Sequence, residues 1–249
     1  MTTLTSPDNI KRLFVAGLHF GHPKTKWNSK IKPFLFGSRQ GIHIFDLTKT
    51  ATFFTKALDF LRDSSAQGKT ILFVSTKPQA QNLLIDLATS LNLPFVTEKW
   101  FGGLLTNWCT TQERLKQLKA LKEEKAKTDF ARYLKKERNK KLKQIKKLEL
   151  WLAGIEGLTQ KPDVVFILDT VYNKLAVLEA KKCKIPVVGV VDSNADPDLI
   201  DYPIPANDDS LSAIQLILNE IHDAIQAGKQ NSEQEKNALN NNEKNAPVN

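Results

Sequence analysis

The sequence has few cysteines and no long apolar run, and both absences limit what it can be. Cys109 and Cys183 lie far apart and outside any CxxC spacing, so nothing indicates a disulfide framework or a thiolate metal site. Two inert thiols are typical of a reducing compartment. No apolar stretch approaches the roughly 18 to 20 residues that a membrane-spanning helix needs. We therefore expect no membrane partner.

The start of the chain also lacks the layout of a targeting segment. MTTLTSPDNIKRLF has no basic-then-apolar order like that of a signal peptide, and it is short and arginine-poor for a transit peptide. We expect the protein to work in the compartment where it is made.

Acidic residues are missing from one long stretch, because residues 11–39 hold seven basic residues and no acidic one. Residues 1–113 hold 13 Lys and Arg against 7 Asp and Glu, and residues 114–150 hold 15 against 5. Residues 151–249 reverse the balance, with 8 against 15. A solvated surface normally intersperses both signs, so two basic blocks indicate a polyanionic partner.

Apolar runs that alternate with helical patterns predict a doubly wound α/β domain, with a parallel sheet of five strands. The strands are expected at 41–47, 70–76, 94–100, 163–170 and 186–193. The helices are expected at 48–67, 77–93, 173–183 and 208–228. Thr48 is the expected N-cap of the first helix.

The alternation is interrupted between residues 108 and 150. Leu115, Leu118 and Leu121 share one helical face, and a second leucine-rich face follows at 142–152, which predicts a basic antiparallel hairpin with coiled-coil-like packing. The expected parts of the chain are an N-terminal arm (1–16), an α/β domain (17–107 and 151–228), the hairpin insertion (108–150) and a disordered polar tail (229–249).

His19 and His22 raise the question of a metal. A structural site needs about four ligands, and no cysteine or third histidine accompanies this pair. We therefore expect no metal. Whether the two imidazoles contact phosphates or pack locally stays open.

The sequence gives little support for an enzyme or a cofactor. No glycine lies in the turns DLTKT and STKPQAQ, so GxGxxG and GxxxxGK[ST] are both absent. The Gly pair in FGGLLTN (101–107) could form an anion-binding nest or a tight turn into the hairpin. Six carboxylates in DSNADPDLIDYPIPANDD (192–209) could hold magnesium, but the prolines make a stiff capped loop an equal alternative.

The segment PKTKWNSKIKPF favours nucleic acid. Its lysines alternate with Trp27 and Phe34, and Trp100 follows another lysine. Lysines neutralise phosphates, and a Trp ring can stack on an exposed base. The alternative is that Trp27 and Phe34 form a small core under a solvated loop.

Five segments, in this order and spacing, resemble the bacterial-type small-subunit ribosomal protein S2 family. They are GLHFGHPKTKWNSKIKPFLFGSRQGIHIFDLTKT, FVSTKPQAQ, EKWFGGLLTNW, PDVVFILDT and IPVVGVVDSNADPDLIDYPIPANDD, and the match spans about residues 10–228. Ser29, Ser75 and Ala195 depart from the family pattern, which affects loop geometry only.

The resemblance implies a flavodoxin-like five-stranded α/β domain with a protruding helical hairpin. It also implies a structural constituent of the small ribosomal subunit, without enzymatic activity, that binds small-subunit rRNA beside other ribosomal proteins. In many bacteria the family helps to dock the large mRNA-binding protein of the subunit. We expect no homo-oligomer. LTNW (105–108) and PANDD (205–209) favour an organelle-encoded plastid protein, with the bacterial cytoplasm or the mitochondrial matrix as alternatives.

We expect the following residues to carry this role. One rRNA surface comprises Lys24, Lys26, Trp27, Lys30, Lys32, Arg39, Lys99, Trp100, Asn107 and Arg114. A second comprises Arg132, Lys135, Lys136, Arg138, Lys140 and Lys141. The residues expected to order a loop or contact a protein are Asp192, Asn194, Asp196, Asp198, Asp208 and Asp209. The rival hypotheses are a magnesium-dependent phosphoryl-transfer enzyme that uses Asp192, Asp196 and Asp198, and a free RNA-binding adaptor.

Overall fold

The computed structural model describes residues 4–244, without the side chains of residue 233 and of residues 235–244. Its centre is a parallel sheet with the strand order β5-β4-β6-β7-β8. These strands are β4 (Ile71–Val74), β5 (Phe95–Val96), β6 (Val164–Ile167), β7 (Val187–Val191) and β8 (Tyr202–Pro205). Counted along the chain, the order is 2-1-3-4-5, which is the flavodoxin-like order. The predicted fold class is confirmed.

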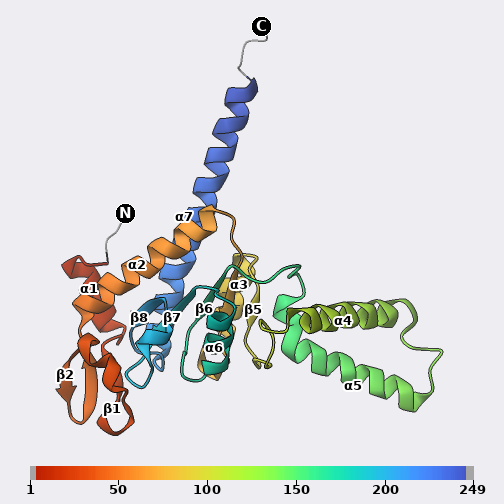
Figure 1. Cartoon of the computed structure of the whole chain (residues 1–249), viewed down its shortest axis with the longest axis horizontal. Coiled ribbons are helices and arrows are strands. Elements are labelled where there is room, and N and C mark those ends of the chain that lie inside the picture. Colours follow the sequence, from red (N-terminus) through yellow and green to blue (C-terminus); the bar gives the residue numbers. More distant parts are fainter. Residues whose placement is uncertain (1–3, 245–249) are drawn as a thin grey trace.

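Helices cover both faces of this sheet (Figure 1), so the central strands are apolar on both sides. Phe73 and Phe166 face one layer, and their neighbours Leu72 and Val165 face the other. The first layer contains α1 (Pro7–Val15), α2 (Leu47–Ala66), α3 (Pro78–Ser90) and α7 (Leu211–Lys244). The second contains α6 (Lys174–Lys182) and the apolar side chains of residues 100–105.

The segment at 41–47 does not join the parallel sheet, so that prediction is wrong. Its strand, β3 (Ile42–Phe45), pairs antiparallel with β1 (Phe20–Pro23) and β2 (Leu35–Arg39) in a separate small sheet. Gln40 and Gly41 both have positive φ, which is the two-residue turn that closes a β-hairpin. The alternation of IHIF indicates a strand but does not say which sheet it enters.

The fifth parallel strand is β8, in a segment expected to be a loop. Pro203 and Pro205 obscure it, because proline cannot donate a ladder hydrogen bond. An edge strand tolerates proline, and β8 lies at the edge beside β7. A smaller correction concerns α2, whose N-cap is Asp46, which accepts from the Thr48 N–H at 3.0 Å.

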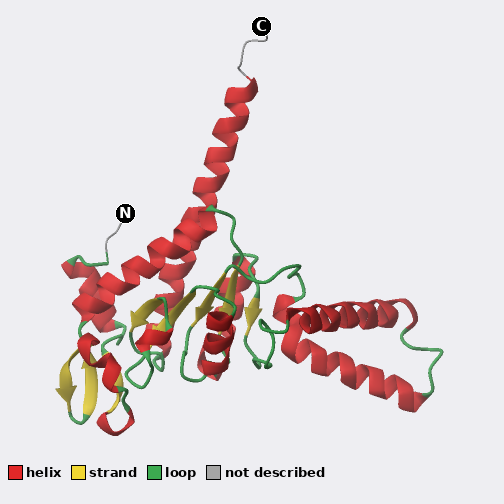
Figure 2. Cartoon of the chain, viewed as in Figure 1, coloured by secondary structure: helices red, strands yellow, loops and turns green. Residues whose placement is uncertain are grey.

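Between the sheet and the small sheet, the chain forms short 3-10 turns: η1 (Lys24–Lys26), η2 (Ser29–Phe34) and η4 (Pro197–Leu199). The predicted hairpin consists of α4 (Trp108–Thr128) and α5 (Lys135–Leu152), which project from the edge of the sheet near β5 (Figure 2). Leu118, Ile145 and Leu148 are buried between the two helices, and Phe130 closes the turn. The turn η3 (Ala153–Ile155) then returns the chain to the sheet.

The predicted start of a disordered tail at residue 229 is also wrong, because α7 continues to Lys244 as a helix that projects beyond the sheet (Figure 1). The segment 229–244 holds no proline or glycine, and eight of its 16 residues are Lys, Glu or Gln, which favour helix, beside five Asn, which favour it less. The polarity of this segment indicates that it adds nothing to a hydrophobic core, but a polar segment can still form a helix. Residues 245–249 lie outside the described residues. No helix of residues 4–244 combines the length and hydropathy needed to cross a bilayer.

Gly154 provides a test of how η3 packs on the sheet. A Cβ at this position would lie 2.2 Å from the carbonyl oxygen of Phe95, so Gly154→Ala must move backbone. We expect it to lower the free energy of unfolding by about 1–3 kcal/mol in urea titrations. Gly157→Ala is the control, because a Cβ there meets nothing within 4 Å. Equal effects of the two substitutions would contradict the packing.

Candidate nucleic-acid interface

The small sheet and its turns, residues 17–45, form a unit that we call the basic arm. Lys24, Lys26, Lys32 and Arg39 are exposed on it. Among the described contacts, none of these four side chains forms an ion pair within the chain, so their charges face solvent. Such exposed cations are the groups that release counterions when they meet phosphates.

An open hollow of about 490 Å³ lies on the basic arm between Lys24 and Lys32. Its walls include Trp27, which is 39% exposed, and Phe36, which is 83% exposed. His43 forms another wall, with its ring 4.8 Å from that of Trp27. Exposed rings beside lysines suit an unstacked base with its phosphate. Sequence reasoning missed Phe36 and His43. Exposure does not alternate along β2, and His43 is buried in β3, so no strand period in the sequence marks these two residues.

Lys30 behaves differently from its neighbours. Its Nζ lies 2.9 Å from carboxylate oxygens of both Asp196 and Asp198. Hydrogen bonds from Lys30 to these two carboxylates raise its pKa above the ordinary value. The Asn28 N–H also donates to the Ser193 carbonyl at 2.8 Å. Lys30 therefore joins the basic arm to the acidic loop through an ion pair at the surface, where its side chain is 49% exposed.

The carboxyl ends of the parallel strands carry a cluster of aspartates around Lys77. The Lys77 Nζ lies 2.8 Å from Asp208, 2.5 Å from Asp209 and 3.5 Å from Asp169. Burial opposes the charge of Lys77, but Asp208 and its neighbours raise the pKa of this lysine well above its ordinary value. Burial, with the nearby Asp169 and Asp192, raises the pKa of Asp208. One buried lysine thus joins the ends of β4, β6 and β8.

His22 of the basic arm meets the same cluster. Its Nδ1 lies 3.2 Å from Asp192 and its Nε2 lies 3.5 Å from Asp209. The hydrogen bond with Asp192 raises the pKa of His22. Asn194 is 3.4 Å from the same ring. Each predicted loop-ordering residue of 192–209 thus has a partner within the chain.

The His22 cluster bears on the expectation of no metal, which stays a prediction. Only cysteine and histidine ligands were counted for that expectation, whereas the fold brings the carboxylates of Asp192 and Asp209 to His22. Ligand atoms of the three residues lie within 4.8 Å of one another, so this set could hold a divalent cation if another ligand completed it. Asp196 and Asp198, which the magnesium-enzyme hypothesis needs, belong instead to the pairs with Lys30.

His19 lies apart from this cluster and is buried. Its ring stacks on Phe14 at 4.3 Å and lies 4.0 Å from the ring of Phe20. Burial lowers the pKa of His19. Of the two alternatives left open by the sequence, the geometry favours packing for His19.

Trp100 does not lie at the surface as expected. Only 8% of the residue is exposed, and its Nε1–H donates to Glu179 at 3.2 Å. It cannot stack on a base without leaving this site, so its assignment to the rRNA surface is wrong. Lys99 and Asn107 are exposed nearby, and the Arg114 guanidinium lies 5.2 Å from the centre of the Phe101 ring.

The hairpin bases divide into two groups. Arg138 pairs with Asp129, and the Lys141 Nζ lies 2.7 Å from Glu124, so these two cations hold the hairpin together. The others are exposed and have no ion pair among the described residues: Arg132, Lys135, Lys136 and Lys140.

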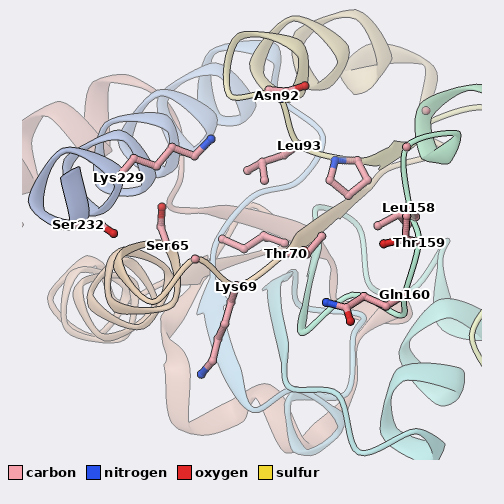
Figure 3. Close-up of a pocket in the computed structure, with 15 residues that line it drawn as sticks. Ser65, Lys69, Thr70, Asn92, Leu93, Leu158, Thr159, Gln160, Lys229 and Ser232 are labelled. Carbon is pink, nitrogen blue, oxygen red and sulfur yellow. The ribbon is translucent and has the colours of Figure 1, made fainter. Parts of the chain in front are cut away.

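A second hollow, of about 610 Å³, lies at the opposite edge of the sheet (Figure 3). Thr70, Leu93, Thr159 and Lys229 line it, and the Lys229 ammonium donates to the Leu91 carbonyl. This hollow adjoins the beginnings of the parallel strands, whereas the acidic cluster lies at their carboxyl ends. It is therefore remote from the acidic cluster and from the basic arm.

A flavodoxin-like sheet without a glycine phosphate loop, joined to a basic arm and a basic helical hairpin, defines an α/β protein suited to contact a polyanion. Residues 13–228 match the sequence pattern of the family described as Ribosomal protein S2. The chain belongs to the ribosomal protein S2 family.

Curated relatives agree with this assignment. Small ribosomal subunit protein uS2 of Coprothermobacter proteolyticus is 43% identical over 221 residues, which are 89% of this chain and 82% of that protein. The protein of the same name from Helicobacter acinonychis is 41% identical, over 91% of this chain and 92% of its own length. That of Wolinella succinogenes is 40% identical, over 88% and 81%. The resemblance seen in the five motifs is confirmed.

Lys77→Met tests the buried cluster. It leaves Asp208 buried without its cation, and we expect a loss of about 3–5 kcal/mol in the free energy of unfolding. Lys77→Met combined with Asp208→Asn removes both members of the most buried pair of the cluster and should recover at least half of that loss. Lys69→Met, at an exposed lysine, is the control. A double variant no more stable than Lys77→Met would show that the pair does not govern stability.

Proposed function

We propose that the chain is a structural constituent of the small ribosomal subunit that binds small-subunit rRNA through the basic arm and the hairpin. Membership of the S2 family supports the assembly, and the distribution of free cations supports the contact. The observation that carries the proposal is that the acidic loop is paired within the chain, while most of the predicted contact lysines on the two projections form no ion pair with the described residues.

The proposed contacts follow from exposure. On the basic arm they are Lys24, Lys26, Trp27, Lys32 and Arg39, with Phe36 added from the hollow. At the root of the hairpin they are Lys99, Asn107 and Arg114. On the hairpin they are Arg132, Lys135, Lys136 and Lys140. Lys30, Trp100, Arg138 and Lys141 are removed from the predicted set, because each is held by a partner within the chain.

The remaining proposals concern partners and place. We propose that the outer carboxylates of the acidic loop, such as the exposed Asp198, face a basic neighbouring ribosomal protein and not RNA, because they would repel phosphate. Docking of the large mRNA-binding protein and the absence of a homo-oligomer stay predictions.

We also propose no enzymatic role. Asp196 and Asp198, two of the three carboxylates that the phosphoryl-transfer hypothesis needs, are paired with Lys30.

The plastid origin favoured by LTNW and PANDD stays a prediction, because the curated relatives named above are bacterial. The free-adaptor hypothesis and the proposed function predict different numbers of copies of the protein per small subunit. A constituent of the subunit should sediment with intact small subunits at close to one copy per particle, whereas an adaptor should not.

Charge reversal on the basic arm tests the rRNA contact. For Lys24→Glu/Lys26→Glu/Lys32→Glu we expect an unchanged fold and weaker binding to small-subunit rRNA. The slope of log K against log salt should become shallower by about 1 for each phosphate that the protein no longer neutralises. Filter binding over a range of salt concentrations measures both quantities.

The matched control is Lys56→Glu/Lys69→Glu/Lys182→Glu, which changes the net charge equally at exposed lysines outside the two surfaces. It should bind more tightly than the arm variant and keep a steeper slope. If the two triple variants bind alike, only net charge matters and the basic arm is misassigned.

A further inference from the structure

The loop FGGLLTN (101–107) folds around a carboxylate of the chain itself. Glu179, on α6, accepts at Oε1 from the Gly103 N–H at 2.8 Å and from Trp100 Nε1 at 3.2 Å. At Oε2 it accepts from the Leu105 N–H at 3.0 Å, and from the N–H and the hydroxyl of Thr106, each at 3.2 Å. The backbone N–H groups of Gly103, Leu105 and Thr106 thus form a nest, and the anion in it is Glu179.

This carboxylate is buried and charged at the same time. Only 6% of Glu179 is exposed, and burial alone would raise its pKa. The donors of the loop outweigh burial and lower the pKa below its ordinary value. Five donors, three of them backbone N–H groups, bind this buried carboxylate. Glu179 therefore fixes both the backbone conformation of the loop and its position beside α6.

The loop leads directly into the hairpin. The Asn107 N–H donates to the Gly103 carbonyl at 2.8 Å, and the Thr111 hydroxyl donates to the Leu104 carbonyl at 3.0 Å. The first turn of α4 is therefore bonded to the segment that Glu179 holds. α6 packs on the sheet through Ala176, Val177 and Ala180. Glu179 is thus a fixed connection between the sheet and the start of α4.

We propose that Glu179 is a positioning residue that sets the direction in which the α4–α5 hairpin leaves the sheet. The consequence for rRNA, namely that the hairpin bases are held at a fixed distance from the basic arm, rests on the proposed function. The direction itself is a property of the free chain and is tested without RNA.

The test measures a distance between the hairpin and the sheet. Spin labels are placed on Lys127→Cys, exposed in the last turn of α4, and Asn82→Cys, exposed on α3, with Cys109 and Cys183 replaced by serine. Double electron–electron resonance should give one narrow distance distribution for this parent. Glu179→Gln has the same shape but no charge, and its amide turns a donor toward the N–H groups of the loop. We expect it to widen the distribution at least about twofold, with unchanged helix content by circular dichroism.

Glu123→Gln makes the same chemical change at an exposed site on α4 and should keep the parent distribution. A folded Glu179→Gln with the parent distribution overturns the proposal, even if its melting temperature is lower. Where Glu179→Gln does not fold, Trp100→Phe/Thr106→Val replaces it, because this pair removes two of the five donors and keeps the charge. Widening in that variant supports the proposal, and the parent width overturns it.

The rRNA affinity of the same variants distinguishes the positioning role of Glu179 from the proposed contact between the hairpin and rRNA. A widened distribution with roughly tenfold weaker rRNA binding, which corresponds to about one or two fewer neutralised phosphates, supports both positioning and the hairpin contact. A widened distribution with unchanged affinity leaves Glu179 as the positioning residue and removes the hairpin from the rRNA surface.

Discussion

The contact of Lys77, which follows β4, with the aspartates that follow β6 and β8 is the interaction on which the rest of the structure depends. Parallel strands place their carboxyl ends along one edge, and here that edge carries Asp169, Asp192 and Asp208. Like charges so close would separate the strands unless cations lay between them. Lys77 supplies one cation from the start of α3. From the basic arm, His22 contacts Asp192 and Lys30 pairs with Asp196, so the contacts near this edge also fix the arm.

This pairing explains how one chain can be acidic in one part and bind a polyanion in another. The carboxylates of the acidic loop pair with Lys30, Lys77 and His22, within the protein. The cations proposed to contact rRNA lie on two projections, the basic arm and the hairpin, with the sheet between them. The sheet therefore acts as a spacer between the two surfaces proposed to bind phosphates, and in our proposal the Glu179 loop fixes one of those surfaces relative to the other.

Part of this arrangement is readable from sequence. The apolar runs of β4, β6 and β7 are long enough to indicate strands covered on both faces, and leucine spacing indicates the hairpin. The errors share a cause, which is that the deciding contact is distant in sequence. Lys30 looks like Lys24 and Lys26, yet it meets Asp196 across 166 positions. Trp100 looks like Trp27, yet Glu179, 79 positions away, holds it inside. The local pattern of IHIF indicates a strand, whereas the prolines of YPIP obscure one. In both segments, only tertiary pairing decides which sheet the strand joins.

The central claim is that internal pairing decides which lysines reach RNA, and a structure of the small subunit containing this chain, determined by electron cryo-microscopy, tests it most directly. We predict that Lys24, Lys32 and Lys136 lie within hydrogen-bond distance of rRNA phosphates, while Lys30 and Lys77 keep their aspartate partners. Phosphate contacts made by Lys30 or by the 192–209 loop, with Lys24, Lys32 and Lys136 facing solvent, would contradict the claim.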